Sequence, residues 1–545
     1  MPFQTLLLVA GAAAVAGVAR RTRLSPPLLL VLAGLAASFI PLIGEYELEP
    51  EVVLFLVLPP LLFAAAWQSS VLNFRQNLRA IGLLSVGLVL FTTLVVGFAV
   101  HAAVPDIPLA VAFTLGAIVS PPDAVAATAV GRQVGLPRRL VTLLAGESLI
   151  NDATALTAYR VAIGAATVGG FSLLEGFREF AVAGAGGVLI GLALAVLAER
   201  LLGVLHDPVL ENTLVLLLPF FGYAAAEQVH TSGVLAVVVA GLYLGHRSPR
   251  QPAATRLQGT AVWKMIEFLL ESVVFALIGL QLTTVVRDLG HRPAGELVLA
   301  AAVTLGTVIL ARFVWVYPAT YLPRMIPAVG SRDPNPPWQY PTVVAWAGMR
   351  GVVSLAAAIA LSTDFPERDL IIFLTFVVVI GTLLIQGLTL PALIRRLGVV
   401  GREEEQDLIN EAGIQHAAAN AAVARLEELL AQEDEVPDDV VTRLREKAQV
   451  RRLSAWERLG ARANSTNGSG AVGAAGRVDG VGPDAPARNG AVEPPTLAFR
   501  RLRRAMIDAE RQVFVQARDS GRIDDEVLNR VQRELDLEET LLDRE

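Results

Sequence analysis

The sequence predicts an all-α integral membrane protein with about thirteen transmembrane helices, followed by a cytoplasmic tail that is part helical and part disordered. Of its 545 residues, 54% are hydrophobic and only 18% are charged, whereas soluble proteins carry about 25% charged residues. The hydrophobic residues form long uncharged stretches, such as 81–100 and 182–197. Such stretches are long enough to cross a hydrocarbon core of about 30 Å.

The residue inventory excludes several other kinds of site. Cysteine is absent, so the chain has no disulfide framework, thiol nucleophile or cysteine-based metal site. Its six histidines are scattered without ligand spacing, and we expect no bound cofactor and no enzymatic activity. A net charge of −6 gives no reason to expect a nucleic-acid partner. Membrane lipids are the expected surroundings.

Clusters of charged, proline and glycine residues divide the first 400 residues into hydrophobic segments. In chain order we expect spans at 3–19, 25–43, 50–70, 79–103, 106–132, 138–165, 176–204, 208–228, 231–247, 258–285, 294–323, 339–362 and 367–397. Boundaries drawn in this way are good to about four residues. The first segment has its basic residues after the apolar run rather than before it, which favours a span over a cleaved signal peptide.

The charges between these segments predict their orientation. Loops after odd-numbered segments hold seventeen basic residues, from Arg20 to Arg402, whereas loops after even-numbered segments hold four. Because basic loops remain in the cytoplasm, we expect the amino terminus outside the cell membrane and the tail inside. A miscount by one segment would destroy this alternation, so the alternation supports thirteen spans.

The tail differs in composition from the membrane domain, which we place at 1–400. Residues 401–463 are charged and helix-prone, and residues 497–545 carry Leu, Val and Ile at helical spacing. Between them, residues 464–496 are rich in Asn, Gly, Ala and Pro and are predicted to be a disordered linker. The tail is either a regulatory, partner-binding unit or a solvated appendage.

Polar groups interrupt the fifth segment at the sequence Ser120-Pro121-Pro122-Asp123. The two prolines remove backbone donors and disrupt the helix beside a carboxylate. Freed carbonyl oxygens and a carboxylate are hard ligands, which suit a small cation better than a soft metal. The sequence therefore predicts a cation site at this break.

The sixth segment adds a second polar cluster, Gly146-Glu147-Ser148-Leu149-Ile150-Asn151-Asp152. Ser148 shares a helix face with Asp152, four residues later. Glu147 shares a face with Asn151 in the same way. Ionisable groups at membrane depth are costly and persist mainly where they pair or function.

The twelfth segment is interrupted at Gly348-Met349-Arg350-Gly351. Segments five and twelve are an odd number apart, so they cross the membrane in opposite directions. Two six-span halves, one to six and eight to thirteen, would place the two breaks at equivalent positions of inverted repeats. Interrupted spans at matching positions indicate the midplane binding site of a secondary transporter.

Structural roles remain as alternatives for these residues. Asp123 and Arg350 could form a purely structural pair, and Glu147 could be a static partner of Arg350. Asp152 could be a fixed hydrogen-bond anchor.

The remaining polar groups have similar alternatives. Asn151 could be a structural amide, and Ser148 could bond to its own helix. For Glu271, near the tenth span, we favour a structural pair with Arg312 over a role in ion passage.

At these motifs the chain resembles the NhaP and NHE-type sodium/proton antiporters, the first cation:proton antiporter family. The resemblance covers roughly residues 5–400, and its most specific parts are 146–152 and 348–351; the sequence from His230 to Ala236 supports it. The segment 120–126 is similar to the family's Asp-Pro-Val-Ala type, with Asp123 on its aspartate. Pro122 stands where some relatives have threonine, so only its carbonyl could be a ligand.

The resemblance implies a homodimer with a six-helix core that moves against a dimerisation domain. It implies that Asp152 binds a cation and a proton alternately, with Asp123, Ser148 and the Pro122 carbonyl nearby. Three further residues would hold the site together: Glu147, Asn151 and Arg350. An Asn-Asp pair, rather than two aspartates, implies electroneutral exchange of one cation for one proton.

The sequence hypothesis is thus exchange of a monovalent cation, Na⁺ or alternatively Li⁺ or K⁺, for protons, serving pH and sodium homeostasis. Two other classes stay open. A gated cation channel would use the same carboxylates, and a membrane sensor or scaffold would act through the tail. Acidic rings or a filter-like loop would favour a channel, and we find neither in the sequence.

Overall fold

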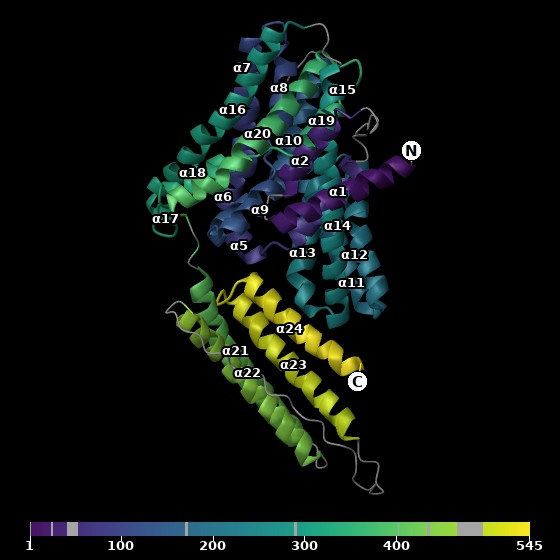
Figure 1. Ribbon diagram of the computed structural model, residues 1–545, viewed down its shortest axis with the longest axis vertical. Helices are drawn as coiled ribbons and strands as arrows, with labels where there is room; N and C mark the ends of the chain where they lie inside the picture. The colour runs from purple at the N-terminus through teal and green to yellow at the C-terminus, as the bar shows by residue number, and fades with distance from the viewer. Residues whose placement is uncertain are drawn as a thin grey trace. The chain divides into compact units, whose positions relative to one another are not determined.

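The computed structural model is helical and contains no strand in the residues that it describes (Figure 1). These residues are 2–22, 26–40, 53–168, 173–287, 292–399, 401, 403–432, 436–465 and 494–544. They form two compact units. One comprises Met1–Arg250 with Gln258–Gly401, and the other comprises Gln251–Leu257 with Arg402–Glu545.

Within the described residues, each of the thirteen predicted segments lies on a helix or on consecutive helices; parts of the second and third segments, 25, 41–43 and 50–52, lie outside them. The elements up to residue 400 are α1 (Pro2–Thr22), α2 (Pro26–Ala37), η2 (Val53–Val57), α4 (Leu58–Trp67), α5 (Val71–Gln76), α6 (Leu78–Gly82), η3 (Leu83–Leu88), α7 (Val89–Ala103), α8 (Leu109–Val119), α9 (Ala124–Val134), α10 (Arg138–Val168), α11 (Leu173–Leu205), α12 (Pro208–Gln228), α13 (Gly233–Arg247), η4 (Ser248–Arg250), α14 (Ala253–Leu280), α15 (Leu282–Arg287), α16 (Ala294–Tyr321), η5 (Leu322–Met325), α17 (Pro327–Gly330), α18 (Gln339–Trp346), α19 (Val352–Ile359) and α20 (Arg368–Leu397).

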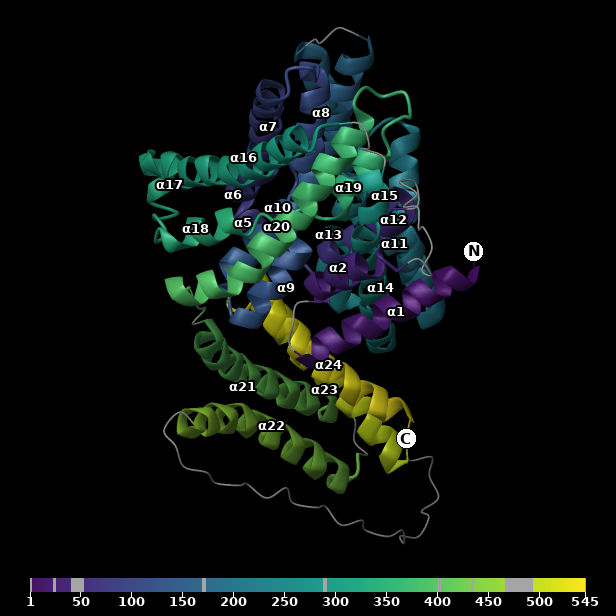
Figure 2. The same ribbon diagram turned by 45° about the horizontal axis from the view of Figure 1, so that its top comes forward.

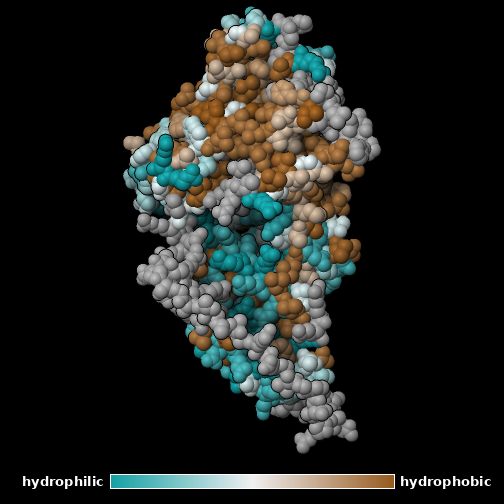
Figure 3. All heavy atoms as spheres, viewed as in Figure 1, coloured by the Kyte–Doolittle hydropathy of each residue, from teal (hydrophilic) through white to brown (hydrophobic). Residues whose placement is uncertain are grey.

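The outer surface of these helices is suited to lipid. Six helical runs in the described residues are long and apolar enough to cross a membrane: Leu78–Ala103, Gly176–Leu205, Pro208–Gln228, Ala253–Arg287, Ala294–Met325 and Arg368–Leu397. Large apolar side chains are exposed on them, such as Leu94, Phe98 and Leu310. Hydrophobic residues dominate the visible surface of these helices (Figure 3). Because soluble proteins rarely expose such large apolar patches, the fold is that of an all-α membrane protein.

Both predicted helix interruptions are confirmed. The fifth segment is broken between α8 and α9, at residues 120–123, and the twelfth between α18 and α19, at residues 347–351. Pro121 and Pro122 lack the backbone N–H groups that a continuous helix needs, and Gly351 is extended, with φ −127° and ψ −162°. Helix α19 packs against α8 and α20, and α9 packs against α10 and α20. The inverted relation of the two halves stays a prediction.

The second unit is built around four helices, α21 (Glu403–Leu430), α22 (Asp438–Ser465), α23 (Pro495–Asp519) and α24 (Asp525–Arg544). Helix α21 packs against α22 and α23, and α24 packs against α23 (Figure 2). Buried apolar side chains such as Leu426, Leu444 and Met506 form its core. Nearly all of the predicted linker at 464–496, namely 466–493, lies outside the described residues.

Candidate functional site

The two interrupted helices meet through a backbone hydrogen bond. The amide of Asp123 donates to the carbonyl of Met349 over 2.7 Å. The Asp123 side chain then caps the second half-helix, because its Oδ1 accepts from the amide of Val125 at 2.8 Å. The break thus fixes one carboxylate at the start of α9, where the positive end of the helix dipole favours a negative charge.

Gly351 lets the second break approach this carboxylate. A Cβ at position 351 would lie 2.5 Å from Oδ2 of Asp123 and 2.7 Å from its Cβ. These distances are too short for any side chain, so glycine is required for the observed approach. Because Gly351 immediately precedes α19, Asp123 also lies beside the amino-terminal end of that half-helix.

Arg350 binds backbone carbonyls at or just after the carboxyl-terminal ends of α8 and α18. Its Nε donates to the carbonyl of Val119 at 2.7 Å, and its Nη1 donates to the carbonyl of Gly348 at 2.5 Å. The residue is 1% exposed. A cation at the carboxyl-terminal end of α8 complements the negative end of its dipole. The contacts recorded for Arg350 therefore differ from both pairs considered above, with Asp123 and with Glu147.

Asn151 connects α10 to the first break. Its Nδ2 donates to the carbonyl of Pro122 at 2.7 Å, and the residue is fully buried. A carbonyl oxygen has two lone pairs, and the Asn151 amide occupies one acceptor position of Pro122. The amide fixes the direction in which this carbonyl points.

Glu147 forms a buried ion pair with Arg312. Nη1 and Nη2 of Arg312 donate to the two carboxylate oxygens at 2.5 and 2.8 Å, and both side chains are 1% exposed. Nε of Arg312 donates to the carbonyl of Val344 at 3.0 Å. The prediction that Glu271 pairs with Arg312 is therefore wrong, because the guanidinium is already occupied by Glu147 and a carbonyl. The partner lies 165 positions away on α10, where no local pattern could have indicated it.

Asp123, Ser148 and Asp152 line one cavity of about 310 Å³, together with Pro122. The cavity is bounded by residues of α4, α9, α10, α14 and α19. The two aspartates are close enough to interact electrostatically. In the described part of the chain, no hydrogen bond or ion pair reaches Asp152, which is 6% exposed. The structure therefore brings together all four predicted ion ligands.

The cavity also contains polar residues that sequence reasoning did not assign to the site. Glu267 and Glu271 line it from α14, and Nε2 of Gln68 donates to Glu267 at 2.7 Å. Ser354 lines it from α19, is 1% exposed, and its Oγ has no hydrogen-bond partner in the described residues. The position of Ser354, three residues after Gly351 in an interrupted span, was the available signal.

An apolar helical unit in which two interrupted helices cross beside a carboxylate-lined cavity has the architecture of an ion-coupled membrane transporter. The chain belongs to the sodium/hydrogen exchanger family: residues 6–396 match the family model described as "Sodium/hydrogen exchanger, transmembrane". This agrees with the resemblance drawn from the motifs. Membership of this family supports cation:proton exchange and identifies a transporter rather than an enzyme.

Individual relatives agree over most of the chain. An uncharacterized Na⁺/H⁺ exchanger of Mycobacterium tuberculosis is 33% identical over 96% of this chain and 92% of its own length. A Na⁺/H⁺ antiporter of Aphanothece halophytica is 33% identical over 73% of this chain and 74% of its own length. The solved sodium proton antiporter MjNhaP1 of Methanocaldococcus jannaschii matches 73% of this chain and 98% of its own, with a TM-score of 0.58 and 18% identity. That likeness shows the fold.

Proposed function

We propose that the chain exchanges Na⁺ for H⁺ by alternating access, and that the two ions compete at Asp152. One observation carries this proposal: Asp123, Ser148 and Asp152 line a single cavity, which Pro122 and Gly351 from the two helix breaks also line. Carboxylate, hydroxyl and carbonyl oxygens are hard ligands suited to a small cation.

The polar groups around the cavity make different contacts, and we assign each a role from them. Asp152 has no hydrogen bond or ion pair within the described residues, so its carboxylate is free to take either ion. Asn151 directs the Pro122 carbonyl, and Arg350 holds the ends of the broken helices. If Asp152 holds a proton or a cation but not both, and rarely crosses the membrane empty, inflow of one ion drives outflow of the other.

Several finer features belong to the same proposal. Asn151 is neutral, so the Asn-Asp pair carries one titrating group, which favours an electroneutral exchange of one Na⁺ for one H⁺. We place the protein in the cell membrane as a homodimer, with the amino terminus outside and the tail in the cytoplasm. Its physiological role would be sodium and pH homeostasis.

A liposome assay tests the assignment of Asp152. The purified chain is reconstituted, a Na⁺ gradient is imposed, and internal pH is followed with a dye. Asp152→Asn should reduce proton flux to that of empty liposomes, because a carboxamide does not titrate near neutral pH. Repeating the assay with Li⁺ and K⁺ defines the cation preference.

Asp106→Asn is the matched control, since Asp106 lies in an exposed loop and undergoes the same chemical change. It should retain wild-type flux. Wild-type flux in Asp152→Asn would dismiss the assignment, provided that both variants elute as the wild type does in size-exclusion chromatography.

A further inference from the structure

Three arginines from separate segments converge on a single aspartate, remote in sequence from the cavity residues. Arg79 and Arg324 donate from their Nη2 atoms to Oδ2 of Asp333, each at 2.6 Å. Arg139 donates from Nη2 to Oδ1 at 2.7 Å. Asp333 belongs to the loop between α17 and α18, and the arginines come from α6, η5 and α10.

This cluster has an excess of positive charge. Burial raises the pKa of Asp333, but the hydrogen bond from Arg139 and the charges of all three arginines hold it below its usual range. The aspartate is therefore ionised and neutralises one of three guanidinium groups. The side chain of Arg324 is 6% exposed, yet its buried Nε has no hydrogen-bond partner among the described residues. A buried donor without a partner costs free energy until it meets an acceptor, and the surplus positive charge of the cluster favours an anionic one.

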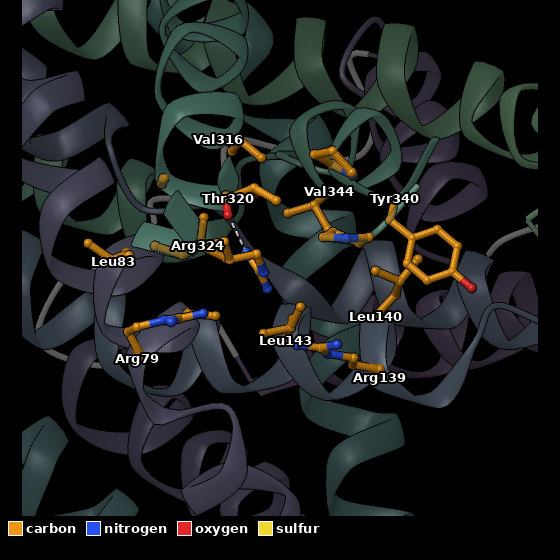
Figure 4. Close-up of a pocket in the computed structure, with 15 residues that line it drawn as sticks. Arg79, Leu83, Arg139, Leu140, Leu143, Val316, Thr320, Arg324, Tyr340 and Val344 are labelled. Carbon is orange, nitrogen blue, oxygen red and sulfur yellow. Dashed lines mark hydrogen bonds between the residues drawn. The ribbon is translucent and has the colours of Figure 1, made fainter. Parts of the chain in front are cut away.

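The arginines border a pocket with apolar walls. Arg79 and Arg139 lie along one edge of the pocket, and Val316 and Val344 lie along the other (Figure 4). Its volume is about 60 Å³, which exceeds the ~10–15 Å³ that a cavity needs to hold one water molecule. This space is of the size of a small tetrahedral group such as phosphate. The arrangement suits a molecule that is anionic at one end and apolar at the other.

The surface around this pocket is characteristic of a membrane interface. Leu322, Met325, Ile326 and Trp338 are 60%, 77%, 56% and 57% exposed. They alternate with the basic residues of the same segments. Tryptophan is enriched at the headgroup level of a bilayer, so exposed Trp338 and its apolar neighbours favour a position where lipid headgroups reach the cluster.

We propose that this pocket binds the phosphate of an anionic phospholipid, with its apolar portion against the valine and leucine walls. The guanidinium fork matches phosphate oxygens through paired charge-assisted hydrogen bonds. By the distribution of basic loops, the lipid would come from the cytoplasmic leaflet. The proposal does not depend on the ion that the chain transports.

Lipid binding at this pocket should stabilise the fold. Val344 lines the pocket and also accepts the hydrogen bond from Nε of Arg312. The pocket is lined by α10, α16 and α18, and α10 and α16 carry the buried pair of Glu147 and Arg312. A bound lipid therefore contacts the helices that hold this pair. A ligand that binds only the folded state raises the stability of that state.

The test compares lipids on the purified chain in a neutral detergent. Phosphatidylglycerol should raise the unfolding temperature saturably, and native mass spectrometry should show it bound. Double substitution of Arg79→Gln and Arg139→Gln, both partly exposed, should weaken this binding about tenfold or more, because two charge-assisted hydrogen-bonding groups are lost. Arg332→Gln, which removes one positive charge at an exposed residue beside Asp333 and outside the pocket, should bind as the wild type does.

Asp333→Asn distinguishes a lipid-binding site from a cluster that only fixes the loop between α17 and α18. Removing the competing carboxylate from a lipid site should strengthen phosphatidylglycerol binding. If the cluster only fixes the loop, the variant should lose stability without any gain in binding. Equal stabilisation by phosphatidylcholine would overturn the proposal, as would undiminished phosphatidylglycerol binding in the double variant. Equal stabilisation by inorganic phosphate would replace the lipid with a free phosphate ligand.

Discussion

Helix α10 carries two buried carboxylates, five residues apart, whose surroundings are opposite. Both oxygens of Glu147 are bound by Arg312. Asp152 faces a cavity of about 310 Å³, with Asp123 as its charged neighbour. Within the described residues it accepts no hydrogen bond. A carboxylate that is satisfied by an arginine holds helices together, whereas one that faces open space can exchange its ligand.

A membrane protein has a physical reason to keep a buried ion pair so near an exchange site. An unpaired charge at membrane depth is costly, so the helix that presents Asp152 needs a fixed position. The Glu147 pair connects α10 to α16, and the Asn151 amide connects it to the first helix break. Substitutions at these carboxylates and at their neighbours test this division of roles.

The first prediction contrasts the same chemical change at both carboxylates. Glu147→Gln leaves Arg312 buried without a counter-charge and should destabilise the chain by about 3–5 kcal/mol. Asp152→Asn removes no ion pair and should unfold at or above the wild-type temperature. Thermal unfolding in detergent measures both.

A rescue experiment sharpens this contrast. Replacing Glu147 and Arg312 together by Leu and Met should recover most of the lost stability, because apolar replacements of a buried pair are often neutral. Equal destabilisation by Glu147→Gln and Asp152→Asn would break the comparison, since it would give the two carboxylates the same role.

The second prediction uses two glycines of the twelfth-span break. A Cβ at Gly348 would lie 2.4 Å from Cδ and 2.7 Å from Nε of Arg312. Gly348→Ala should therefore strain the buried pair and cost about 1–3 kcal/mol of stability. Gly351→Ala instead displaces the Asp123 carboxylate. It should impair Na⁺-driven proton flux more strongly than Gly348→Ala does, relative to the stability that each variant loses.

Much of this fold and site follows from the sequence, for identifiable reasons. Proline and charge interrupt hydrophobic segments visibly, so the breaks at 120–123 and 347–351 were predictable, as was the face shared by Ser148 and Asp152. The partner of Arg312 was not, because Glu147 and Glu271 are equally acidic and only tertiary packing selects between them. The convergence of Arg79, Arg139 and Arg324 on Asp333 likewise depends on three segments that are distant in sequence.

The third prediction compares two buried hydroxyl groups. Thr382 Oγ1 accepts from the amide of Arg350 at 3.0 Å and donates to the carbonyl of Val378 at 2.7 Å. Thr382→Val leaves that amide unpaired and should cost about 1–3 kcal/mol. The Oγ of Ser354 has no partner in the described residues, so Ser354→Ala should leave the unfolding temperature unchanged or slightly higher. A large loss in Ser354→Ala would indicate that this hydroxyl is bound in the fold after all.

The smallest effect concerns Glu538, a paired carboxylate of α24 in the second unit. Burial raises the pKa of Glu538, but the hydrogen bond from Arg503 and the charges of Arg503, Arg451 and Lys447 lower it from 4.5 to about 2. A lowered folded-state pKa means that this pairing stabilises α24 fully above pH 4.5. The contribution is lost as the pH falls toward 2.

Hydrogen exchange of α23 and α24 in the full chain, corrected for intrinsic rates, should therefore show protection that declines below pH 4.5. Glu538→Gln should be less protected at neutral pH and show a shallower decline, because it lacks the titrating group; an identical pH profile in the variant would show that other carboxylates set the response.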